Sequence, residues 1–173
     1  MPMLPIRKDD NAYARAAGLG VVTGMRSMLP LALLSAALQP GGAVGGYSPA
    51  RGDTLAGRLL ATPKGGIVTG IAAIGEVVND KLPITPGRNE PPLIAERLIV
   101  GAIVGGVVCQ LGGRSPLVGA AIGSTASIAA SFAGYYGRTI LPRVTGIPQQ
   151  IWGVAEDAIA VTLGAKTLGL RWR

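Results

Sequence analysis

The fold is decided by two neighbouring apolar stretches, LIAERLIVGAIVGGVVCQLG at residues 93–112 and SPLVGAAIGSTASIAASFAGYYG at residues 115–137. The first contains only two charged residues, and the second contains none. Because an α-helix rises about 1.5 Å per residue, each stretch is long enough to cross a hydrocarbon core of about 30 Å. The two stretches therefore predict a helical membrane protein.

Three further apolar segments lie outside this pair, at residues 16–38, 65–82 and 148–168. Together the segments predict an all-α integral membrane protein with about five transmembrane helices, in a single membrane domain that covers residues 1–173. The remaining parts are a polar N-terminal arm (1–14), a Gly/Pro-rich loop (39–64) with a short interfacial helix, and a basic-aromatic tail (169–173).

The composition supports a membrane protein and excludes several kinds of site. Charged residues make up 14% of the chain, whereas soluble domains carry about 25%. The chain has no histidine and one cysteine, which excludes a disulfide framework, a Cys/His zinc site and a histidine-based catalytic triad. We therefore expect no metal, no cofactor and no enzymatic activity.

The net charge of +7 comes from basic residues that are scattered singly between apolar stretches. Nucleic acid is recognised by clustered basic residues, so we do not expect a nucleic-acid partner. Basic residues that flank apolar helices suit anionic lipid headgroups, and the expected partner is the lipid bilayer. Counted over five crossings, eight basic residues fall on one side and seven on the other, which selects no orientation.

Glycines recur four residues apart in four of the five segments. Such spacing lets helix backbones approach closely, although a chain with 27 glycines produces some pairs by chance. The predicted packing glycines are Gly20, Gly24, Gly66, Gly70, Gly101, Gly105, Gly119 and Gly123. Small-residue faces also favour a homo-oligomer or a docked subunit. The best candidate face is Gly119, Gly123 and Ser127, unless this stripe packs inside the same subunit.

A short motif occurs twice, as RSMLP at residues 26–30 and RTILP at residues 138–142. Each copy is followed by an apolar helix that carries a carboxylate, Glu76 after the first and Glu156 after the second. If the repeat is real, segments 1–2 correspond to segments 4–5 with inverted topology, as in many transporters.

Several charged residues fall inside the apolar segments, where one charge costs about 2.5–3.5 kcal/mol on insertion scales. They are tolerable if they are paired or face water, and they form either a polar pathway with an ion site or an ion-pair lock. Asp80 also fits a position at the membrane interface. The candidates are Arg26, Glu76, Asp80, Arg97, Arg138, Glu156 and Asp157.

Pro30 and Pro142 each follow an arginine by four residues, and both are candidate helix breaks. A proline frees backbone carbonyls, and a broken helix beside an arginine can hold an anion. The alternatives are a simple kink at Pro30 and a loop position for Pro142.

Two motifs resemble a known family: Gly24-x-Arg26-Ser27-x-x-Pro30, and Glu76-x3-Asp80-Lys81-x-Pro83 with Arg97 beyond it. Together with the later Glu-Asp helix they are similar to the bacterial domain-of-unknown-function 4126 family of small integral membrane proteins. The resemblance implies a multi-pass protein of the bacterial cytoplasmic membrane and assigns no chemistry.

Two functions remain open from the sequence. One is a small-solute or ion transporter or channel with a charged site at the repeat interface. The other is a non-transporting accessory or scaffold subunit of a larger membrane complex. A water-sized polar cavity lined by the charged residues favours the first, and charges paired in a dry core beside an apolar docking face favour the second.

Overall fold

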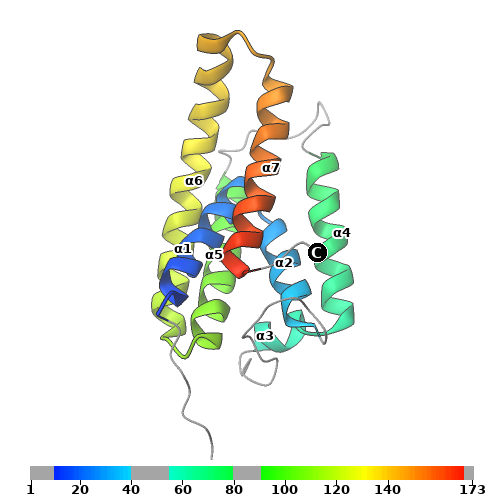
Figure 1. The fold of residues 1–173 in the computed structure, drawn as a ribbon, viewed down its shortest axis with the longest axis vertical. Coiled ribbons are helices and arrows are strands. Elements are labelled where there is room, and N and C mark those ends of the chain that lie inside the picture. The colour runs from blue at the N-terminus through cyan, green and yellow to red at the C-terminus, as the bar shows by residue number, and fades with distance from the viewer. Residues whose placement is uncertain (1–9, 40–54, 80–90, 170–173) are drawn as a thin grey trace, which may run out of the picture.

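The computed structural model describes residues 10–39, 55–79 and 91–169, and this part of the chain is helical, with no strand (Figure 1). The all-α prediction is therefore confirmed for these residues. The helices are α1 (Ala12–Met25), α2 (Leu29–Leu38), α3 (Leu55–Leu60), α4 (Pro63–Asn79), α5 (Pro91–Leu111), α6 (Pro116–Thr145) and α7 (Gln149–Leu168). The expected interfacial helix within 39–64 corresponds to α3, whereas α1 begins inside the expected N-terminal arm.

Among the described residues, two helices are long and apolar enough to cross a membrane, α5 with 21 residues and α6 with 30. They are the two stretches whose length and hydropathy predict a membrane protein. α4 is shorter, with 17 residues, and α7 carries three charged residues within 20. Five crossings are therefore not confirmed.

Close backbone packing joins α5, α6 and α1. A Cβ added at Gly101 or Gly123 would come within 3.0 Å of backbone on the opposite helix, and the same holds for Gly20 and Gly24 of α1 against α6. Gly105 and Gly119 face each other in the same way, so six of the predicted packing glycines lie at close helix contacts. Hydroxyl groups strengthen these contacts, since Ser127 Oγ donates to the Arg97 carbonyl at 2.9 Å.

The other two predicted packing glycines, Gly66 and Gly70, do not contact the backbone of another helix. Gly66 faces the flexible side chain of Gln39, and Gly70 has no atom within 4 Å of an added Cβ. The intersubunit prediction for Gly119, Gly123 and Ser127 is wrong, because all three residues are buried inside this subunit between α6 and its neighbours. Their spacing does indicate a helix interface, but the partner helices are α5 and α1.

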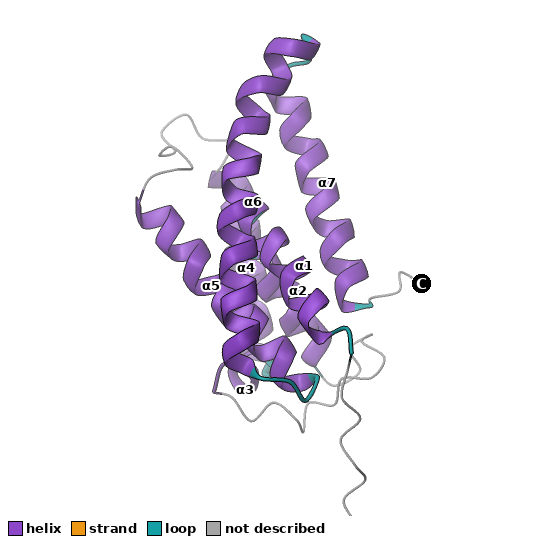
Figure 2. Ribbon diagram, turned by 90° about the vertical axis from the view of Figure 1, so that its left-hand side faces the viewer, coloured by secondary structure: helices purple, strands orange, loops and turns teal. Residues whose placement is uncertain are grey.

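The segment at residues 16–38 does not run straight through the molecule. Along α7, Thr167 lies at Gly18 of α1, and Gly164 lies between Val22 of α1 and Leu33 of α2. α1 therefore runs antiparallel to α7, while α2 runs parallel to it, from the level of Asp157 to that of Gly164. The prediction of one crossing helix is wrong: α1 and α2 form a helical hairpin that returns toward the end where it began (Figures 1 and 2).

The turn of this hairpin follows from local chemistry. Arg26 ends α1 in an extended conformation (φ −143°, ψ 109°), with its N–H bonded to the Val22 carbonyl at 2.7 Å. Pro30 lies in the first turn of α2, where its missing N–H costs nothing. Pro30 is therefore a helix start after a break, and the simple-kink alternative is excluded.

Pro142 does not break its helix, so that prediction is wrong. α6 continues through Pro142 to Thr145 and ends at Gly146, whose positive φ of 71° suits a helix C-cap. Like any proline inside a helix, Pro142 lacks the N–H that would donate to the carbonyl four residues earlier, and α6 continues for only three residues beyond it. The two copies of the Arg-x3-Pro motif thus have different backbone structures, and the inverted repeat stays a prediction.

Candidate functional site

The break between α1 and α2 lies at a buried arginine. The Arg26 residue is 4% exposed, and its Nε donates to Oδ1 of Asp157 on α7 at 2.6 Å. Ser131 of α6 approaches the same end of α1, with its Oγ 3.3 Å from the Gly24 carbonyl. The charge of Arg26 is therefore neutralised inside the bundle, about halfway along α6.

Glu76 of α4 closes the site from the other side. Its Oε1 accepts from the Ser27 N–H at 2.8 Å, and its Oε2 accepts from the Met28 N–H at 2.9 Å. N–H groups at a helix start lack intrahelical acceptors, and the helix dipole favours an anion there. The free N–H groups of the broken helix are thus occupied by a carboxyl group of the chain itself, and a bound anion at this break stays a prediction.

A small cavity of about 50 Å³ lies at this junction, and Arg26, Glu76 and Asp157 line it. Apolar side chains from α2, α4 and α7 complete its wall: Leu29, Ala73, Val77 and Val161. Since one water takes roughly 30 Å³ of liquid volume, the cavity has room for one or two waters or a small ion. We call this junction the break site.

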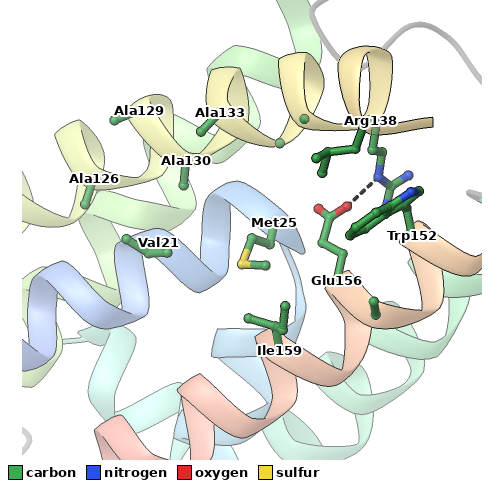
Figure 3. Close-up of a pocket in the computed structure, with 14 residues that line it drawn as sticks. Val21, Met25, Ala126, Ala129, Ala130, Ala133, Arg138, Trp152, Glu156 and Ile159 are labelled. Atoms are coloured by element: carbon green, nitrogen blue, oxygen red, sulfur yellow. Dashed lines mark hydrogen bonds and ion pairs between the residues drawn. The ribbon is translucent and has the colours of Figure 1, made fainter. Parts of the chain in front are cut away.

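A second pair of charges joins α6 to α7. Arg138 Nε donates to Oε2 of Glu156, and the two side chains are 18% and 11% exposed. The pair lies at one end of a cavity of about 550 Å³ between α1, α6 and α7, where Trp152 covers it (Figure 3). The sequence carries no signal for this cavity, because its wall consists mainly of small apolar residues on three separate helices.

The predicted charged residues thus divide into groups. The structure brings Arg26, Glu76 and Asp157 together at the break site, and it pairs Arg138 with Glu156 in the other cavity. Arg97 is buried in α5 and lines neither cavity. Asp80 lies outside the described residues. The Arg26–Asp157 pair links the two halves of the proposed repeat.

The break site offers a limited chemistry. It combines one guanidinium, two carboxylates and two backbone N–H groups beside a water-sized space. Within the described ranges, no group of three or more His, Cys, Asp or Glu residues is placed to hold a metal ion. The arrangement suits a water, a proton or a small inorganic ion.

Comparison of the chain with protein-family models, curated proteins and solved structures finds no match. The resemblance to the domain-of-unknown-function 4126 family stays a prediction that rests on the two motifs.

Proposed function

We propose that the chain is a multi-pass protein of the bacterial cytoplasmic membrane that moves a proton or a small inorganic ion through the break site. The observation that carries the proposal is the convergence of Arg26, Glu76 and Asp157 on a water-sized cavity at a broken helix. The cavity volume favours the ion over a larger solute, since only one or two water molecules fill it.

The membrane location is supported by apolar side chains on the outer surface. Five on one helix, α4, are 57–67% exposed: Ile67, Val68, Ile71, Ile74 and Val78. α6 and α7 expose further large apolar residues, among them Leu117 and Val144. A water-soluble monomer rarely exposes contiguous apolar faces of this extent, and lipid covers them without cost.

The break site has features that membrane proteins retain for function. Ionisable groups inside a membrane are expensive and usually line ion or proton paths. Irregular backbone at membrane depth is tolerated where protein groups or water satisfy it, and Glu76 supplies that satisfaction at Ser27 and Met28.

The proposal is tested by flux measurements on the purified chain in liposomes. We expect movement of H⁺, Cl⁻, Na⁺ or K⁺ above that of empty liposomes, with a loss of at least tenfold in Asp157→Asn and Glu76→Gln. Asp10→Asn is the control, because Asp10 is an exposed carboxylate that pairs with Arg114 far from the break site. Absence of flux for all four ions, or equal flux in all variants, would contradict the proposal.

An accessory-subunit role is the second candidate, and α4 favours it. Gly70 and Gly75 on this helix have open space beside them, between exposed apolar side chains. Such a face can receive a helix of another chain. If it does, Gly70→Leu shifts the assembly to a smaller mass on native mass spectrometry, and ion flux is absent from the wild-type chain.

A further inference from the structure

The larger cavity has one polar end and one apolar end. Arg138, Glu156 and Trp152 lie together at the polar end, and Val21 and Ala126 lie at the other (Figure 3). The wall between them is almost entirely apolar, and Met25 and Ile159 form part of it. An occupant therefore needs a polar group at one end and hydrocarbon along the rest of its length.

The size of the cavity separates two kinds of occupant. A helix about 10 Å across that rises 1.5 Å per residue fills roughly 120 Å³ per residue. The 550 Å³ cavity would then take about five residues of helix, far fewer than a membrane-crossing segment needs. The volume does fall inside the range of roughly 300–1,000 Å³ that small-molecule pockets occupy. A single hydrocarbon chain fits within this volume, whereas a helix of another chain could insert only its side chains.

The polar end indicates which head group the chain carries. Arg138 and Glu156 form a pair with no net charge, so a head group of zero net charge adds no uncompensated charge there. A phosphate can lie against the guanidinium of Arg138 while an ammonium group lies against the carboxylate of Glu156. The buried Nε1 of Trp152 has no acceptor among the described residues, and a phosphate or ester oxygen supplies one.

We propose that this cavity binds an acyl chain of a zwitterionic phospholipid, with the phosphate and ammonium of its head group at Arg138 and Glu156. The proposal rests on the membrane location and is independent of ion movement through the break site. The lipid chain enters from the side, where Ala129 and Ala133 of α6 line the cavity and are exposed.

Fluorescence quenching by lipids with brominated chains tests whether a phospholipid binds in this cavity. The chain has two tryptophans, so Trp172→Phe leaves Trp152 as the only one. In mild detergent, brominated phosphatidylethanolamine should quench Trp152 fluorescence to saturation, and phosphatidylglycerol with the same chains should bind at least fivefold more weakly. Ala133→Leu and, independently, Ala129→Leu should weaken binding at least tenfold. Ala121→Leu is the matched control, because Ala121 is exposed on the same helix outside the cavity.

Three results would overturn the proposal. The first is quenching that rises linearly without saturation, which indicates contact with bulk lipid. The second is equal affinity for both head groups, which removes the role of the charge pair. The third is a change of assembly mass in Ala133→Leu or Ala129→Leu while quenching stays intact, which identifies a second copy of the chain as the occupant. Ion flux through the break site is measured separately and does not depend on this result.

Discussion

Arg26 and Asp157 hold the hairpin turn against α7. We expect Asp157→Ala to lower the free energy of unfolding by about 3 kcal/mol, because it leaves a buried guanidinium without this carboxylate. The estimate is at the lower end of the usual range because the Asp157 side chain is 27% exposed. Thermal unfolding in detergent measures the change. Asp10→Ala, at an exposed pair, should leave the unfolding temperature unchanged, and equal shifts in the two variants would contradict the role of Asp157.

Glu76 acts on the backbone of the turn. Glu76→Ala removes the acceptor of the Ser27 and Met28 N–H groups, and we expect a loss of about 1–3 kcal/mol. Glu76→Gln keeps one oxygen acceptor, so it should recover part of that loss. Unfolding by a denaturing detergent, followed by circular dichroism, compares the two variants. Equal stability of both with the wild-type chain would show that α2 begins at this position without the cap.

At the scale of helices, the glycines give a matched pair of substitutions. Gly123→Ala places a methyl group against the Gly101 carbonyl, which is backbone and cannot move aside, so we expect lower stability and a lower yield of folded protein. Gly70→Ala adds a methyl group in open space and should stabilise α4 by up to about 1 kcal/mol. The measurement is the thermal unfolding temperature of both variants and of the wild-type chain in the same detergent. A lower unfolding temperature in Gly70→Ala would show that α4 packs there against another chain.

The sequence predicts the positions of α4, α5 and α7 because each is an apolar stretch of suitable length between Pro- or Gly-rich connections. It does not predict the hairpin, because residues 16–38 are as long and apolar as a true crossing. What decides the hairpin is tertiary: Glu76 caps the start of α2, and Gly20 and Gly24 hold α1 on α6. The sequence predicts a helix break at Pro142 for a similar reason, since a proline in the last helical turn cannot be distinguished by sequence from a proline in a loop.

The charged residues of both sites are visible in the sequence, because charges inside apolar segments are rare. Their pairing is not visible. Asp157 reaches Arg26 only because α1 stops halfway along α6, and Arg138 reaches Glu156 because α6 continues past Pro142. Trp152 and the cavity beside it carry no sequence signal at all.

At the scale of the whole molecule, the hairpin changes which segments lie on the same side of the proposed membrane. It places Asp10 and Lys64 at one end and Thr145 at the other, whereas a crossing by residues 16–38 would separate Asp10 from Lys64. Single cysteines at these positions, in a Cys109→Ala background, distinguish the two topologies by labelling with a membrane-impermeant maleimide in intact cells. We expect the same accessibility for Asp10→Cys and Lys64→Cys, and the opposite for Thr145→Cys. Opposite accessibility of the first two would contradict the hairpin.

The same topology determines at which end of the molecule the basic residues lie. With the hairpin, five basic residues of the described ranges belong to segments at the end that holds Asp10: Arg15, Arg58, Lys64, Arg114 and Lys166. Three described basic residues belong to the other half, Arg97, Arg138 and Arg143, and Arg26 lies at the hairpin turn between them. The excess of five over three favours an orientation with the Asp10 end in the cytoplasm, since cytoplasmic segments carry the excess of Lys and Arg. We expect Thr145→Cys to be the labelled variant.

The contact of α1 with α6 also sets an order of events during synthesis. Gly20 and Gly24 pack against the backbone of α6, about 100 residues later in the chain, and Asp10 pairs with Arg114. When the ribosome has made α1 and α2, the surface that receives them does not yet exist. With 14 and 10 residues, neither helix is long enough to be retained in the bilayer alone. In the membrane location that we propose, the N-terminal hairpin therefore reaches its final position only after α6 has been made and inserted, so a later helix completes the packing of the two first ones.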